Sequence, residues 1–181
     1  MFTLPCIGMF YHDVAALLKN AKYVAVIYVK INPEFNIYLD KDENVVALEC
    51  LNADAKDAYG KKSFAGKSLD ETLQTAVSIA AEKGYMKEDQ TVALTITECT
   101  TDLNATELQT KMDSVVTEAA KEQDITVTTA MDMSEEVRTA QKEAGLIKQA
   151  CSNCNGTGDC PDCPVCGGSF KCVVCGGSGT L

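Results

Sequence analysis

Residues 23–52 read YVAVIYVKINPEFNIYLDKDENVVALECLN and contain three short apolar runs at the spacing of β-strands. The first run, residues 23–31, is almost continuously apolar, as in a strand covered on both faces. In the second, residues 35–39, apolar and polar side chains alternate, as in a half-buried strand. Residues 41–44 supply a polar turn before the third run, residues 45–51. We therefore expect three consecutive strands.

The dipeptide Asn32-Pro33 separates the first two runs. Proline fixes its own φ, has no backbone N–H to donate and restricts the preceding residue to extended conformations. Within a sheet, proline is confined to strand ends and edges. The chain is therefore expected to turn at Asn32-Pro33, between two strands.

Two amphipathic helices are predicted after these strands. Ser68, with Glu71 three residues later, forms a capping box, and residues 69–81 carry one apolar stripe. Asn104 begins the second helix, whose apolar stripe lies within residues 108–120. Both stripes are expected to pack on the sheet.

Shorter elements complete the domain. Residues 91–97 and 125–130 alternate at the period of a strand and are rich in β-branched side chains. A short helix is expected from Ser134 to Gly145, and residues 53–65 are expected to hold another that ends near Gly60. The main order is βββ-α-β-α-β-α, which predicts an α+β fold with helices on one face of a mostly antiparallel sheet.

Composition limits the classes of function. The 181 residues are 46% hydrophobic and 23% charged, which indicates an ordinary soluble core with a small appendage. A formal charge of −10 without a basic stripe argues against binding to nucleic acid. No transmembrane segment is expected, because the longest apolar run is far below the ~20 residues that span a bilayer. The first residues lack the positive start of a signal peptide.

Several motifs follow one another in a specific order. Residues 29–37 read VKINPEFNI and residues 45–55 read VVALECLNADA; shorter motifs lie at residues 66–73, 82–85 and 134–138. In this order they resemble the extracytoplasmic middle domain of RsgI-type anti-sigma factors, over residues 23–147. The resemblance implies a regulatory domain that works with membrane-anchored signalling proteins.

The resemblance also implies self-cleavage between Asn32 and Pro33, after which the two pieces remain paired until they are separated. The chemistry is plausible, because an asparagine side-chain amide can attack its own backbone carbonyl and a strained turn can twist the tertiary amide before proline. The plain alternative is that Asn32-Pro33 only ends a strand. No other catalytic constellation occurs in the sequence, so an enzyme acting on a diffusible substrate is not expected.

Residues 151–181 change abruptly in composition. They are dominated by glycine and small residues and contain seven cysteines: Cys151, Cys154, Cys160, Cys163, Cys166, Cys172 and Cys175. The tail has too few apolar residues to fold by hydrophobic burial alone. Metal or disulfides must therefore stabilise it. The repeated two-residue spacing between cysteines is typical of zinc knuckles. With the glycine-rich residues 155–158 and 176–179, the tail also resembles the CxxCxGxG repeats in the zinc-binding region of DnaJ. The tail is therefore predicted to bind one or two zinc ions.

The assignment of ligands stays open at this point. As the pairing of the outer repeats in DnaJ implies, Cys151, Cys154, Cys172 and Cys175 can form one complete site. Cys160, Cys163 and Cys166 then form a second, completed by Asp159, Asp162 or water. A single zinc site with spare thiols also fits. Disulfides are favoured in an oxidising compartment, and the inner three cysteines partly match an iron–sulfur run.

The sequence therefore predicts an N-terminal extension over residues 1–22 with a short helix at 13–20, an RsgI-like domain over 23–147, and a cysteine-rich tail over 148–181. The function expected is regulatory, with the tail binding a protein partner. One alternative is a non-cleaving interaction or chaperone-like zinc module, and another is a thiol oxidoreductase.

The residues alone favour a cytoplasmic location, whereas the resemblance favours an extracytoplasmic location. The single cysteines Cys6, Cys50 and Cys99 are interpreted as small buried hydrophobes.

Overall fold

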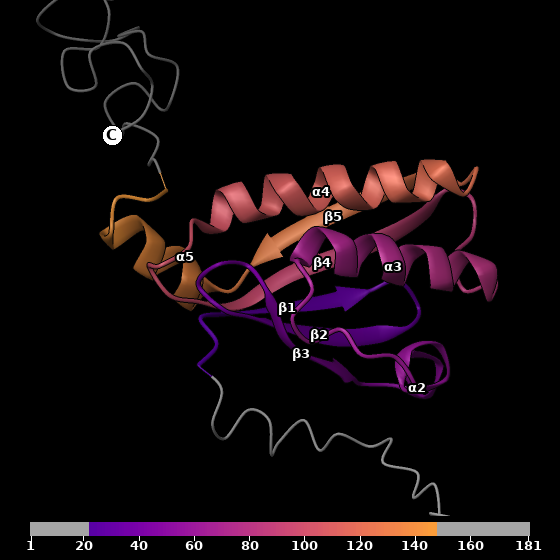
Figure 1. The fold of residues 1–181 in the computed structure, drawn as a ribbon. Helices are drawn as coiled ribbons and strands as arrows, with labels where there is room; N and C mark the ends of the chain where they lie inside the picture. Colours follow the sequence, from indigo (N-terminus) through magenta and orange to yellow (C-terminus); the bar gives the residue numbers. More distant parts are fainter. Residues whose placement is uncertain (1–21, 148–181) are drawn as a thin grey trace, which may run out of the picture.

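The computed structural model describes residues 22–147, which form an α+β fold with helices packed on a five-stranded sheet (Figure 1). The strands are β1 (Ala25–Lys30), β2 (Glu34–Leu39), β3 (Val45–Cys50), β4 (Gln90–Cys99) and β5 (Val127–Met133), and the helices are α2 (Ala53–Tyr59), α3 (Leu69–Glu82), α4 (Ala105–Glu122) and α5 (Glu135–Glu143). The predicted helix at 13–20 and the predicted metal-stabilised tail lie outside the described residues.

The strand order in the sheet is β3-β2-β1-β4-β5, so β1 is central. β1 pairs antiparallel with both β2 and β4, and β2 pairs antiparallel with β3. The sheet is mostly antiparallel, as predicted, but β4 and β5 are parallel, so it is mixed. The reason is the intervening helix α4, which returns the chain to the end of the sheet at which β4 began.

The helices begin where local capping signals predict. Ser68 Oγ accepts a hydrogen bond from Glu71 N at 3.2 Å, and Asn104 Oδ1 accepts from Thr106 N at 3.0 Å and Glu107 N at 3.2 Å. These side chains satisfy first-turn amides that have no partner inside the helix. Of the four helices within residues 22–147, none has the length and apolar character to cross a bilayer.

The last strand begins later than the sequence predicts. The prediction was residues 125–130, whereas β5 covers Val127–Met133. Ile125 lies beyond the end of α4 and caps it, because its N–H donates to the Ala120 carbonyl at 3.0 Å. Asp124, at φ 56°, turns the chain out of the helix. The alternation of inward and outward residues in β5 is nevertheless the predicted one.

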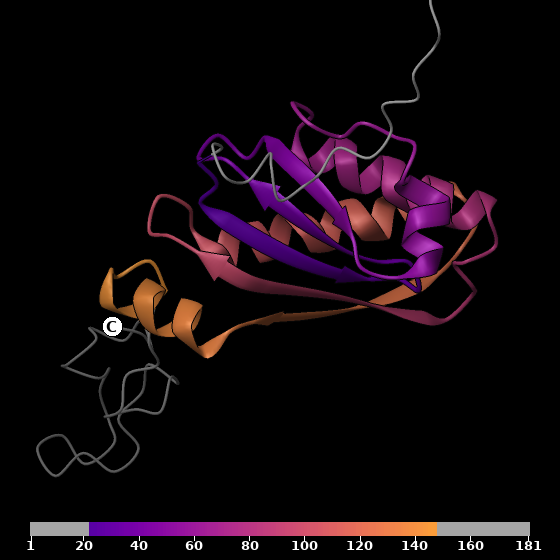
Figure 2. The same cartoon turned by 90° about the horizontal axis from the view of Figure 1, so that it is seen from below.

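The core lies between the sheet and the two long helices, α3 and α4. Ala25, Ile27 and Val29 of β1 are fully buried on this face. In Figure 2 the strands lie in front of α3 and α4, and no helix of residues 22–147 covers the other face. On that other face Val26 is nevertheless buried, whereas Tyr28 is half-buried and Lys30 is exposed, so the cover expected on both faces of residues 23–31 is only partial within residues 22–147. Tyr28 is half-buried there because its hydroxyl donates to a carboxylate instead of packing in an apolar layer.

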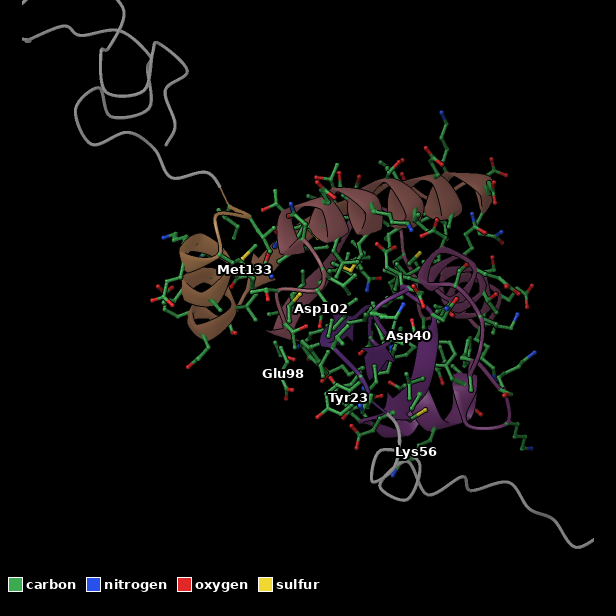
Figure 3. The ribbon with its side chains drawn as sticks, turned by 60° about the vertical axis from the view of Figure 1, so that its left-hand side comes forward. Tyr23, Asp40, Lys56, Glu98, Asp102 and Met133 are labelled. Carbon is green, nitrogen blue, oxygen red and sulfur yellow. The ribbon has the colours of Figure 1, made fainter. Side chains whose placement is uncertain are left out.

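The two ends of the sheet carry different parts of the chain. The β1–β2 turn and α2 lie at one end, and α5 lies at the other (Figure 1). The chain enters the sheet near α5, where Ala25 pairs with Cys99 and Met133 pairs with Ile96. Figure 3 shows Tyr23, Glu98, Asp102 and Met133 toward this end. The Asn32-Pro33 turn is thus remote from both ends of the described chain.

Candidate functional site

Asn32 is the tip of a very tight turn between β1 and β2. Lys30 pairs with Glu34 as the last pair of the ladder, and the Ile31 N–H donates to the Pro33 carbonyl at 3.1 Å. Only Asn32 lies between these two residues. The chain therefore reverses direction within residues 31–33. This turn contains the Asn32–Pro33 bond, at which the resemblance implies cleavage.

The backbone of Asn32 is strained. Its φ is 147°, in a region that residues with a Cβ rarely adopt and that glycine occupies readily. The following proline also disfavours this conformation, because a residue before proline normally has an extended, negative φ. The Asn32 side chain is exposed, while Pro33 is buried. Within residues 22–147 the Asn32 side-chain amide has no hydrogen-bond partner.

Proline removes a donor from this turn, and a side chain from β4 replaces it. In the hydrogen-bonded pairs of an antiparallel ladder, the two opposed residues exchange N–H···O bonds in both directions, but Pro33 has no N–H for the Ile31 carbonyl. The Ile31 carbonyl instead accepts a hydrogen bond from Gln90 Nε2. Gln90 is held in turn because its Oε1 accepts from Lys87 N at 2.9 Å. The strained turn is thus fastened to the sheet on its β4 side.

Asn52 contacts the turn from the other side. It is the N-cap of α2, and its Oδ1 accepts a hydrogen bond from Ala55 N at 2.8 Å. The same oxygen accepts from Glu34 N at 3.2 Å. Its Nδ2 donates to the Asn32 carbonyl oxygen at 3.4 Å. One side chain therefore bonds to the residue after Pro33 and to the carbonyl of the Asn32–Pro33 peptide bond.

The carboxylate of Glu34 is engaged on the open face of the sheet. Glu34 Oε2 accepts a hydrogen bond from the Tyr28 hydroxyl at 3.0 Å, and Glu34 Oε1 lies 3.4 Å from Lys30 Nζ. Burial and the neighbouring Glu34 carboxylate raise the pKa of Tyr28 above its ordinary value. The phenol is therefore a stable neutral donor, and these contacts hold the ends of β1 and β2 together.

Sequence reasoning identified Asn32 and Pro33 but gave no role to Asn52 or Gln90. Asn52 carries a detectable signal, since an asparagine immediately before a helical segment is a common N-cap. Gln90 carries no such signal, because it is 59 residues from Ile31 and only the fold brings them together.

The cysteines singled out in the sequence have no part in this turn. Cys99 is buried, as expected, and burial followed by the nearby Asp102 raises the pKa of its thiol to about 11. Cys50 is half-buried, and its Sγ donates to the Ala55 carbonyl at 3.3 Å. Cys6 and the seven cysteines of the tail lie outside residues 22–147. Inside that range, no three His, Cys, Asp or Glu side chains come together as a metal site.

A cleft of about 330 Å³ lies at the opposite end of the sheet. Its lining consists of Tyr23, Val24, Thr97, Glu98, Cys99, Thr100, Glu136, Val137 and Ala140. No Lys, Arg or His contributes to this lining, and its one thiol is held neutral by the raised pKa of Cys99. The Asn32-Pro33 turn therefore remains the better candidate for chemistry in the described part of the chain.

Comparison with known proteins supports the family resemblance of the folded domain. A search of the curated proteins finds no match. The DnaJ-like character of the tail stays a prediction. Residues 24–151 match the family described as the anti-sigma factor RsgI-like central domain, and because they make up more than half of the 181 residues, the chain belongs to that family.

Proposed function

We propose that this domain is a self-cleaving regulatory module that cuts its own chain between Asn32 and Pro33. The observation that carries the proposal is the φ of 147° at Asn32, directly before the proline of a one-residue turn. Strain of this kind costs on the order of 1–3 kcal/mol and persists only where surrounding contacts impose it. Gln90 and Asn52 supply such contacts from two sides.

The reaction needs no group from outside the chain until its last step. Asn32 Nδ2 attacks the Asn32 carbonyl carbon and forms a five-membered succinimide ring. The bond from that carbon to Pro33 N breaks, and the Pro33 nitrogen takes up a proton as the new N-terminus. Cleavage releases the strain of the turn and profits from the intramolecular position of the nucleophile. Water then opens the succinimide to a free C-terminus.

The cut chain is expected to stay assembled. β1 lies between β2 and β4 and pairs with both, and its inward side chains are buried in the core. Fragment 1–32 would therefore remain bound to fragment 33–181 by hydrogen bonds and apolar contacts alone. Separation of the two fragments is the step that would carry a signal to protein partners, of which sigma factors are the class that the family description names.

Mass spectrometry of one preparation tests the proposal. Under denaturing conditions we expect two fragments, residues 1–32 and 33–181, and under native conditions one complex with their summed mass. The sum equals the uncut mass while the succinimide persists and is heavier by one water after hydrolysis. The control Asn32→Ala should remain one chain. An uncut wild-type chain would overturn self-cleavage and leave a non-cleaving interaction module.

The tail adds a second component to the proposal. Cys151, Cys154, Cys160, Cys163, Cys166, Cys172 and Cys175 supply the ligands for one or two zinc ions, with Zn–S distances of about 2.3 Å. The support is their spacing, which is typical of zinc knuckles. The loaded tail would present a folded surface to a protein partner.

Metal analysis with a count of free thiols tests this component. Zinc retained in the native mass, with no disulfides, supports a metal-bound tail and a reducing location. Disulfides without zinc would overturn the zinc assignment and favour an extracytoplasmic location.

A further inference from the structure

We propose that Asn52 is a catalytic residue of the Asn32–Pro33 cleavage, in which its Nδ2–H group stabilises the oxygen of the carbonyl under attack. This inference rests on the proposed self-cleavage and adds a second residue to it. The observation behind it is that Asn52 Nδ2 lies 3.4 Å from the Asn32 carbonyl oxygen, although 20 residues separate the two. Asn52 therefore touches an atom that reacts.

The orientation of the Asn52 amide is fixed by its oxygen. Asn52 Oδ1 accepts from Ala55 N at 2.8 Å and from Glu34 N at 3.2 Å. Both partners are backbone donors, so an inverted amide would place its NH2 group against two N–H groups. The nitrogen must consequently point toward the turn. A donor that is aligned before the reaction begins costs no reorganisation when charge develops.

The reaction makes this donor more effective. When Asn32 Nδ2 attacks, the carbonyl carbon becomes tetrahedral and its oxygen gains negative charge. A hydrogen bond to a charged oxygen is shorter and about twice as strong as one to a neutral carbonyl. The long contact of 3.4 Å is thus expected to tighten as the intermediate forms. Asn52 would then lower the barrier more than it stabilises the uncut chain.

The structural role of Asn52 can be separated from this catalytic role. Capping of α2 and bonding to Glu34 N use only Oδ1, and an aspartate provides the same acceptor and caps helices as well as asparagine does. The Nδ2 group has one partner within residues 22–147, the Asn32 carbonyl. Asn52→Asp therefore keeps the acceptor and removes the donor.

The test follows cleavage of the full 181-residue chain during cell-free synthesis, which starts the reaction at a known time. Samples are denatured at intervals, and the uncut chain and fragment 33–181 are quantified. We expect Asn52→Asp to slow cleavage at least about tenfold, since removal of one oxyanion donor from an enzyme lowers the rate by about 100- to 1,000-fold. Asn52→Ser, which keeps a capping oxygen and adds no charge, should be slowed as well.

A matched control makes the same chemical change at another helix start. Asn104 caps α4 with its Oδ1, and α4 begins at the opposite end of the sheet from the β1–β2 turn (Figure 1). Asn104→Asp should cleave at the wild-type rate. The unfolding midpoint of each Asn52 variant is measured in the non-cleaving Asn32→Ala background. This measurement distinguishes an effect of unfolding from an effect of removing the Nδ2 donor.

The outcomes separate the two proposals. Slow cleavage by both Asn52 variants, with midpoints close to that of Asn32→Ala alone, supports the role of Asn52. Cleavage of Asn52→Asp at the wild-type rate overturns that role and leaves self-cleavage standing. Slow cleavage by the aspartate variant alone also overturns it, because the added charge then explains the effect. A wild-type chain that stays uncut overturns both proposals.

Discussion

Gln141 of α5 bonds to the first residue of α4, since its Oε1 accepts a hydrogen bond from Ala105 N at 3.0 Å. Its Nε2 donates to the carbonyls of Leu103 at 2.8 Å and Thr100 at 3.0 Å. Gln141 is completely buried, although glutamine is rarely so. One side chain therefore fastens α5 to the loop between β4 and α4.

Replacement of Gln141 by alanine should destabilise the domain by about 2–4 kcal/mol, because it leaves several backbone groups without partners and opens a cavity. Chemical denaturation measures the change. Gln74, exposed on α3, provides the control, and Gln74→Ala should change stability by less than about 0.5 kcal/mol. Equal effects of the two substitutions would contradict the role of Gln141.

The strain at Asn32 predicts an unusual order of stability among variants that cannot cleave. Both Asn32→Ala and Asn32→Gly lack the nucleophile. Elsewhere a glycine is less stable than an alanine by about 0.5–1 kcal/mol, but at a φ of 147° the glycine avoids the strain. We expect Asn32→Gly to be the more stable of the two by about 1 kcal/mol in urea denaturation. The ordinary order would show that the turn relaxes.

The missing N–H of Pro33 predicts a coupling with Gln90. In the Asn32→Ala background, Gln90→Leu should cost about 1–2 kcal/mol because the Ile31 carbonyl loses its donor. Pro33→Ala supplies a backbone N–H opposite that carbonyl, so the same Gln90 substitution should then cost less. A double-mutant cycle measures the difference. Additive effects would mean that the Gln90 contact does not compensate for the proline.

The raised pKa of Cys99 is expected to lower the free energy of unfolding at alkaline pH. Burial, with a smaller contribution from Asp102, raises the pKa of its thiol from 9.0 to about 11. As pH rises through this window, the unfolded chain loses the proton while the native state keeps it, so the free energy of unfolding falls. Cys99→Ala lacks this component. The stability advantage of wild type over Cys99→Ala should therefore shrink between about pH 9 and about pH 11, and a constant difference would contradict the raised pKa.

Features that depend on neighbouring residues could be predicted from the sequence. The starts of α3 and α4 were predictable because Ser68 and Asn104 cap amides within three residues of themselves. The parallel pairing of β4 and β5 was also within reach, since a strand, a long helix and a strand usually form a parallel unit. The contacts of Gln90 and Gln141 were not, because 59 and 36 residues separate them from their partners. The φ of Asn32 was not predictable either, because the turn is held by Gln90 and by Asn52, which lies 20 residues away in sequence.

The chain enters and leaves the described domain at one end of the sheet, and the Asn32-Pro33 turn lies at the other. A tension between residues 22 and 147 therefore reaches Ala25, which pairs with Leu39 and Cys99, before any other residue of β1. In a cut chain, the hydrogen-bonded pairs of β1 would break one after another, from Ala25 to Lys30. In an uncut chain, β2 continues from β1 through Pro33 and keeps it in place. Cleavage would thus convert a strand at the centre of the sheet into a mechanically weak element while its resting contacts stay the same.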